Sequence, residues 1–282
     1  MTLPKILGVF ALITFISNHG FAQQEMLFRI KFLPNKTYST VMVNDMKMEM
    51  DSSGDTVKRN QMEAKGLKLP MFIDMRQEMG LTTRTGSLTA DKRIPVTISY
   101  DKMGVTMKMN GKEMQQPNKF VGMKIKGHAA EDGRLKVDEI EGDASPEIKI
   151  ALEKMMSQVL NAVKFPNKAM KIGDTFTQEI PMEMPAGGTS MNMLINSRYV
   201  LKEIKGNQAF FDYTQNIALD LTSAQRNSTA TGSGTGKMIY DIPANYITET
   251  TGDMTMKMTL SVGETSMKIN VRAKSSVKAS IL

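Results

Sequence analysis

Long stretches of alternating apolar and polar residues limit how this chain can fold more than any other feature. Such alternation places successive side chains on opposite faces of a β-strand, whereas a helix needs a period of about 3.6 residues. The alternating stretches are 27–33, 38–50, 96–100, 105–109, 120–127, 176–184, 191–204, 209–221, 237–242, 246–260 and 266–282. Because strands this long are typical of large curled antiparallel sheets or half-barrels, we predict a mainly β protein.

Turn residues between these stretches predict hairpins. Gly206-Asn207 joins two of the stretches and Asp132-Gly133 joins two more, and both pairs suit tight turns. From Asn227 to Gly236, glycine alternates with Ser and Thr over much of the segment, which favours a strand with one nearly bare face over a flexible linker. Such a face lets another element or a ligand approach closely.

One segment follows a helical period instead. Apolar residues recur at helical spacing from Ile148 to Val163, with Ser145 suited to the N-cap and Pro146 to the first helical position. We predict a central amphipathic helix over 145–164. It separates an N-terminal β-meander half, 23–144, from a C-terminal one, 165–282.

The two flanks of this helix share short motifs. Residues 32–36 are echoed by 165–168, and residues 105–109 by 254–258, in the same order along the chain. Alternating sequences match one another easily, so two arrangements stay open. The protein is either one large curled sheet or a pair of duplicated meander halves.

The N-terminus has the features of a signal peptide. Lys5 precedes an apolar run from Ile6 to Ile16, and Gly20 and Ala22 suit a signal peptidase site. We therefore expect residues 1–22 to be removed. The chain contains no cysteine, which excludes a lipid anchor, disulfides and a thiol nucleophile. Since no later stretch is apolar enough for a membrane helix, we expect a soluble exported protein, periplasmic or extracellular.

The charge and the remaining polar residues disfavour nucleic-acid binding, catalysis and metal binding. The formal net charge is only +7, and the basic residues from Lys257 to Lys278 have no aromatic residues among them, so we expect no nucleic-acid binding. His128 lacks a recognisable nucleophile or orienting partner in the sequence. The acidic run 138–143 lacks the pattern of a calcium loop. We expect no enzyme activity, no metal and no cofactor.

Motifs in the second half of the chain suggest a family. Residues 171–176, 201–209, 232–236 and 255–258 resemble an uncharacterised family of exported β-rich proteins from Bacteroidota and related bacteria, and the resemblance covers residues 26–282. More loosely, long-stranded meanders with a helix are similar to half-barrel carriers of the LolA and LppX type. That second resemblance implies a lipid, acyl-chain or lipoprotein partner.

Methionine makes up 27 of the 282 residues, and many of these methionines are spaced two apart. On a strand, residues at this spacing share one face. Methionine is unbranched and polarizable, so a face lined by it adapts to ligands of varied shape. The candidate ligand-binding residues are Met46, Met48, Met50, Met107, Met109, Met254, Met256 and Met258.

Three functions follow from this pattern. The first is a non-enzymatic exported protein that binds a hydrophobic ligand, a lipid, acyl chain or lipoprotein, on its methionine-rich face. The second is a cell-envelope module with a closed methionine core, an envelope protein as partner and no small ligand. The third is Cu(I) binding by thioethers, which the scarcity of His and Cys disfavours.

Overall fold

The computed structural model describes residues 25–53, 56–64, 68–115, 121–130, 135–142, 163–186, 189–220, 229–262 and 265–282. The strands are β1 (Thr37–Ser53), β2 (Met71–Thr85), β3 (Ile94–Met109), β4 (Lys112–Gln115), β5 (Lys124–Ala129), β6 (Leu135–Glu141), β7 (Thr175–Ala186), β8 (Thr189–Lys205), β9 (Gln208–Asp220), β10 (Thr229–Asp241), β11 (Tyr246–Val262) and β12 (Thr265–Ile281). A short helix, α1 (Thr56–Ala64), lies between β1 and β2.

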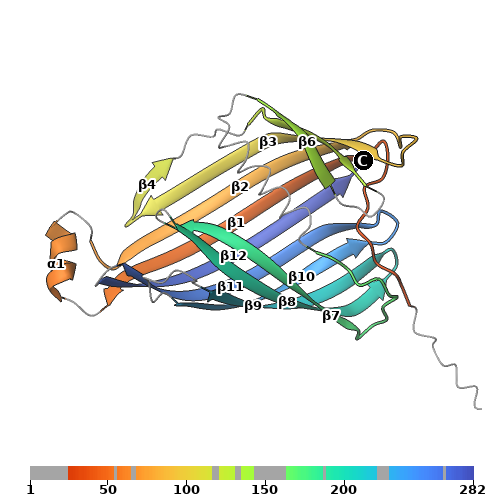
Figure 1. Ribbon diagram of the computed structural model, residues 1–282. Helices are drawn as coiled ribbons and strands as arrows, with labels where there is room; N and C mark the ends of the chain where they lie inside the picture. Colours follow the sequence, from red (N-terminus) through yellow and green to blue (C-terminus); the bar gives the residue numbers. More distant parts are fainter. Residues whose placement is uncertain are drawn as a thin grey trace, which may run out of the picture.

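These strands form one 12-stranded antiparallel sheet in the order β6-β5-β3-β2-β1-β12-β11-β10-β9-β8-β7, with β4 paired to β3. The first and last strands, β1 and β12, lie side by side at its centre. The sheet curls strongly but is not closed between its edge strands β6 and β7 (Figure 1). The prediction of a large curled antiparallel sheet is therefore confirmed. A single sheet holds both halves of the chain, while their origin by duplication stays a prediction.

One strand prediction was wrong, and one long strand was missed. The alternation in 27–33 forms no strand, and the segment crosses the end of the sheet instead. Residues 71–85, which the sequence analysis passed over, form the long strand β2. The stretches 96–100 and 105–109 belong to one strand, β3, whose register with β2 shifts at a bulge beside Gly80. Such a bulge adds one residue and interrupts the alternation that the sequence shows.

Two other predicted segments fall outside the described residues. The signal peptide, 1–22, is one, and the central helix is the other, since residues 143–162 are not described. The last two residues of that predicted helix, Val163 and Lys164, belong to no helix.

The segment from Met26 to Leu33 closes one end of the curled sheet. Phe28 packs edge-on against Phe211 and Tyr240, and Phe32 packs edge-on against Tyr38. The Tyr240 hydroxyl donates to the Arg29 carbonyl oxygen at 2.6 Å, which fixes the segment across strands far away in the sequence. In Figure 1 this segment runs down the right-hand end of the sheet, while α1 lies beyond the opposite end.

Candidate functional site: the inner face of the sheet

The register of the strands places one continuous row of apolar residues across nine strands. In an antiparallel sheet, directly paired residues point to the same face. The row reads, from β3 to β7, Met109, Ile73, Met48, Val271, Met256, Gly232, Ile217, Ile195 and Ile180. We call the face that carries this row the inner face and the opposite one the outer face. Phe28 and Phe32 also pack on the inner face, at its closed end.

Among the described strand residues, the inner face carries a charged side chain only at its edge, where Lys112 of β4 pairs with Met109. On β1 it presents Tyr38, Thr40, Met42, Asn44, Met46, Met48 and Met50, and on the paired strand β12 it presents Ile269, Val271, Ala273, Ser275, Val277, Ala279 and Ile281. The neighbouring strands β2 and β11 continue this pattern, because their registers with β1 and β12 are also continuous. The strand β3 follows it on both sides of its bulge. Apart from Lys112 at the edge, the charged side chains of the described strands lie on the outer face, so the rest of the inner face suits an uncharged apolar occupant.

The structure brings the eight candidate methionines together on this face. Met46, Met48 and Met50 lie on β1, Met107 and Met109 on β3, and Met254, Met256 and Met258 on β11. Met256 is only 8% exposed, whereas the other seven are half-buried. The six on β1 and β11 pack with Ile217, Ile269 and Val271 in one apolar cluster. The thioethers therefore line a surface that is partly accessible.

Sequence reasoning missed the part of this face that β2 contributes. Met71, Ile73 and Met75 pair directly with Met50, Met48 and Met46. They join the β1 methionines to those of β3. Their own spacing of two residues was the signal that could have found them.

The two ends of the inner face differ in composition. At the closed end, which we call the aromatic end, Tyr38, Tyr100, Tyr240, Phe28 and Phe211 are almost fully buried. At the opposite end, which we call the methionine end, the eight candidate methionines dominate. Phenylalanine and tyrosine rings pack in fixed edge-to-face pairs, whereas methionine adapts its shape.

The glycines of β10 make room for a tyrosine. The predicted strand is confirmed, and Gly232, Gly234 and Gly236 lie on the inner face. Tyr213 lies across Gly236 and Gly252, since a Cβ at Gly236 would stand 2.3 Å from its ring. Its hydroxyl donates to the Thr251 carbonyl oxygen at 3.0 Å. The Tyr213 side chain of the neighbouring strand β9 thus packs over the glycine face of β10.

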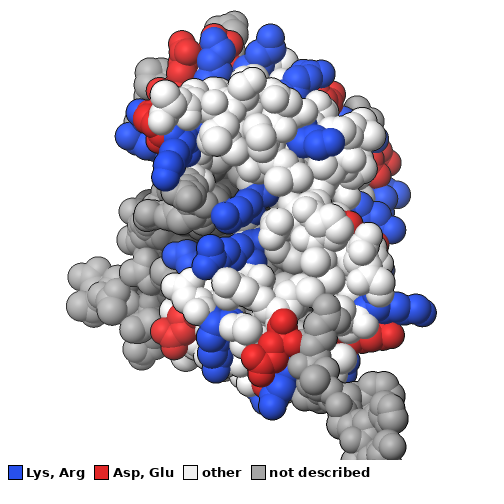
Figure 2. Space-filling view, turned by 90° about the vertical axis from the view of Figure 1, so that its right-hand side faces the viewer, with Lys and Arg blue, Asp and Glu red and all other residues white. Residues whose placement is uncertain are grey.

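Viewed from the aromatic end, the molecule shows a broad uncharged surface. Figure 2 looks onto this end and shows basic side chains gathered over a hollowed part at its left. Exposed apolar residues near this end include Leu27, Leu88, Ile172 and Leu282.

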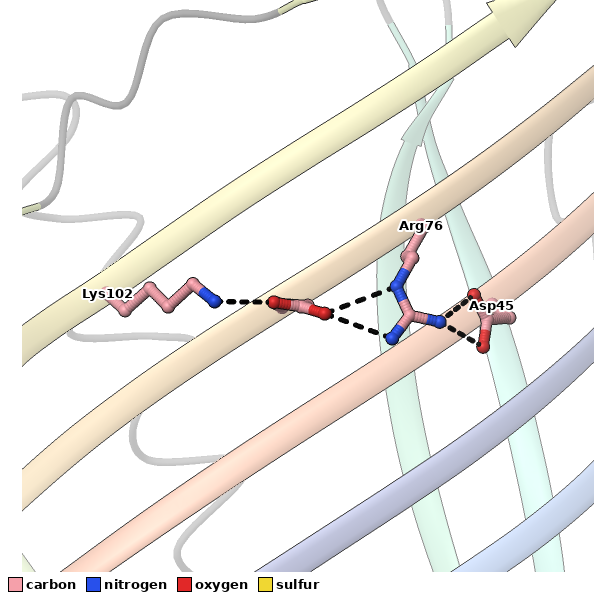
Figure 3. Close-up of polar contacts among 4 residues, drawn as sticks. Asp45, Arg76 and Lys102 are labelled. Atoms are coloured by element: carbon pink, nitrogen blue, oxygen red, sulfur yellow. Dashed lines mark hydrogen bonds and ion pairs between the residues drawn. The ribbon is translucent and has the colours of Figure 1, made fainter.

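The outer face carries mixed charges that pair across strands. Arg76 donates to both carboxylate oxygens of Asp45, at 2.9 and 3.0 Å, and also binds Glu78 at 3.0 Å. Lys102 binds the other oxygen of Glu78 at 2.7 Å, so the chain of ion pairs spans β3, β2 and β1 (Figure 3). Hydrogen bonds from Lys102 and Arg76 hold the pKa of Glu78 below its usual value. These exposed pairs keep the outer face hydrated and add little to stability.

Other polar groups of the described residues form local pairs. His128 lies on β5 with its Nδ1 2.8 Å from the Asp138 carboxylate, so it has a local hydrogen-bond partner. In the described part of the chain, no three His, Asp or Glu side chains lie close enough to hold a metal ion. Within that same part, no helix has the length and apolar character needed to cross a membrane.

Comparison with known proteins gives no family assignment. No protein-family model and no curated protein matches the chain. Among solved structures, it is similar to a lipovitellin chain from a study of lipid–protein interactions, with 12% identity and a TM-score of 0.47 over 89% of this chain. This chain spans 26% of that lipovitellin chain. Pseudomonas aeruginosa OccK5 (OpdH) matches with 8% identity and a TM-score of 0.29, over 88% of this chain and 99% of its own. At these scores, neither likeness bears on what the chain binds.

Proposed function

We propose that this protein is an exported, non-enzymatic carrier that holds a hydrophobic ligand, an acyl chain or lipid, against the methionine end of its inner face. The observation that carries the proposal is the uncharged row from Met109 through Met48 to Ile180, much of which is half-buried. Half-buried apolar side chains gain free energy when a ligand removes their remaining surface from water. The adaptable thioethers suit acyl chains of varied shape.

The placement of charge supports the same proposal. Lys47 and Glu49 alternate with Met46, Met48 and Met50 along β1, and the charged residues lie on the outer face. A sheet with one hydrated face and one apolar face needs a cover for the apolar side. An acyl chain is a cover of matching chemistry, and export follows from the signal-peptide features of residues 1–22.

The test is ligand extraction followed by binding. Purified protein is extracted with solvent and its lipids are identified by mass spectrometry, and the stripped protein is titrated with the apolar fluorophore diphenylhexatriene. We expect co-purifying acyl lipid and saturable fluorophore binding. Clean extracts together with no binding would contradict the proposal and favour a closed envelope module.

A matched pair of substitutions locates the binding to one face. Met48→Asp places a carboxylate on the inner face, and Lys47→Asp places one on the outer face of the same strand. We expect the first to reduce fluorophore binding at least tenfold, because the new charge loses hydration on contact with the ligand. The second leaves binding unchanged. Where Met48→Asp does not fold, Met48→Gln serves as the milder variant, with a smaller loss expected.

A further inference from the structure

A band of uncharged polar side chains crosses the inner face between its aromatic and methionine ends. Gln77 of β2 pairs with Asn44 of β1, which pairs with Ser275 of β12. The next residues in the row are Gly252 and Gly236, and Tyr213 lies over both of them. We call Gln77, Asn44, Ser275 and Tyr213 the polar band.

The Tyr213 hydroxyl continues this band over the bare glycines. A Cβ on Gly252 would lie 2.5 Å from the Tyr213 hydroxyl oxygen and 3.1 Å from Ser275 Oγ. The two hydroxyl groups therefore point toward the same place on the inner face. Glycine at this position leaves room for both, which a larger side chain would fill.

Three members of the band lack intramolecular partners. No hydrogen bond is made by the side chains of Asn44, Gln77 or Ser275 within the described structure, and all three are half-buried. An amide offers two N–H donors and one carbonyl acceptor, and a hydroxyl offers both functions. Polar groups enclosed among apolar neighbours favour a ligand that satisfies them, because leaving them unpaired on ligand binding is unfavourable.

The neighbouring rows show which way a ligand extends from the band. Toward the aromatic end, Met79 and Tyr38 are buried and the segment carrying Phe28 and Phe32 covers the face. Toward the methionine end, the half-buried row from Asn44 to Met50 runs for about 20 Å at the usual rise of a strand. A hydrocarbon chain that starts at the band therefore lies along the methionines.

We propose that the polar band binds the ester and hydroxyl groups of a neutral acylglycerol whose acyl chain occupies the methionine end. This inference rests on the proposed carrier function and specifies its ligand class. The amides of Asn44 and Gln77 donate to the ester carbonyl, and the Ser275 hydroxyl pairs with a hydroxyl of glycerol. The Tyr213 hydroxyl, which donates to the Thr251 carbonyl oxygen, accepts from a glycerol hydroxyl. An anionic headgroup at the polar band finds no cation beside it among the described strand residues, since Lys112 lies farther along the face, opposite Met109. The charge of that headgroup would therefore lose hydration without compensation.

The test compares two lipids that differ only in one phosphate. Monooleoylglycerol and its phosphate ester are titrated against the stripped full-length protein by displacement of diphenylhexatriene. We expect the neutral lipid to bind at least tenfold more tightly. Equal affinity, or tighter binding of the phosphate ester, would overturn the assignment of ligand class while leaving the carrier function intact. Absence of binding by both lipids and the fluorophore would contradict the carrier function itself.

A matched set of leucine variants tests whether the polar-band residues contribute to lipid binding. Asn44→Leu and Gln77→Leu remove polar groups from the band, and Asn270→Leu makes the same change on the outer face of β12. Each band variant is expected to weaken monooleoylglycerol binding roughly three- to tenfold, the effect of one lost hydrogen bond. The affinity of the band variants for diphenylhexatriene is expected to stay unchanged. The Asn270→Leu variant is expected to bind monooleoylglycerol with wild-type affinity. Wild-type affinity for monooleoylglycerol in both band variants would refute the proposal.

Discussion

The two ends of the inner face share the same sheet and the same register, yet they are built from different side chains. The aromatic end holds five of the six tyrosines, with the sixth, Tyr213, at its border in the polar band, and a segment that contributes Phe28 and Phe32 covers it. The methionine end holds the eight unbranched methionines, seven of them half-buried, around the buried side chains of Ile217, Ile269 and Val271. The comparison teaches that one end supplies rigid packing and stability, whereas the other leaves an adaptable surface, which is where we propose that a ligand binds.

Alkaline pH should have the largest effect on stability, and this effect should arise from the buried tyrosines of the aromatic end and its border. Burial raises the pKa of Tyr100, Tyr213 and Tyr246 to about 12, from an ordinary value of 10.0. The unfolded chain therefore ionises first, so stability is fully present below pH 10 and is lost as the pH rises toward 12. Phenolate absorbance should stay low near pH 10 and rise together with unfolding measured by circular dichroism. Free titration of all tyrosines near pH 10 in folded protein would contradict the packing of this end.

Removal of a ring from the aromatic end should have the largest effect of any single substitution. Phe28 is 1% exposed and contacts Phe165, Phe211 and Tyr240. Phe28→Ala is expected to lower the free energy of unfolding by about 3–5 kcal/mol, measured by urea denaturation. The matched control is Phe72→Ala, because Phe72 is 53% exposed, and a change within about 0.5 kcal/mol is expected there. Similar losses in both variants would refute the tight packing of Phe28 at the aromatic end.

Crowding the boundary between the ends should have an intermediate effect. A Cβ at Gly236 would stand 2.1 Å from the Thr251 carbonyl oxygen and 2.3 Å from the Tyr213 ring. Gly236→Ala is expected to lower the free energy of unfolding by about 1–3 kcal/mol. At Gly104 nothing lies within 4 Å of such a Cβ, so Gly104→Ala should be neutral or slightly stabilising. Equal effects of the two changes on the urea midpoint would contradict the placement of Tyr213.

Truncation of a side chain at the methionine end should lower the free energy of unfolding less than Phe28→Ala and Gly236→Ala do. Met48 is half-buried, so Met48→Ala is expected to lower the free energy of unfolding by about 1 kcal/mol, and Met48→Leu by less. Thermal and urea denaturation measure this, with Phe28→Ala as the reference. A loss at Met48 as large as that at Phe28 would indicate a closed, tightly packed methionine core.

Much of this fold was accessible from alternation alone. The runs around Met46 and Met254 were predicted as strands with their methionines on one face, and their registers confirm this. Alternation does not predict which distant strands pair, such as β1 with β12. This pairing depends on contacts between segments far apart in the chain. The stretch 27–33 alternates but forms no strand, since Phe28 and Phe32 pack onto sheet residues rather than joining a ladder.

The candidate site was predicted only in part for a similar reason. Periodicity identified the eight methionines, but the residues between them in space, Ile73 and Val271 among them, lie on other strands. The polar band is likewise a product of register, because Gln77, Asn44 and Ser275 are far apart in sequence. A single polar residue in an alternating run does not indicate a binding site by itself. The polar band becomes recognisable only when the strand registers are known.

The measurement that tests the carrier account most directly uses the absence of cysteine from the chain. Single-cysteine variants Met48→Cys and Lys47→Cys place a polarity-sensitive fluorophore on the inner and outer faces of the same strand. Addition of monooleoylglycerol to the stripped protein should shift the emission of the probe at position 48 to the blue and leave that at position 47 unchanged. No shift at either position, or equal shifts at both, would contradict a ligand held on the inner face.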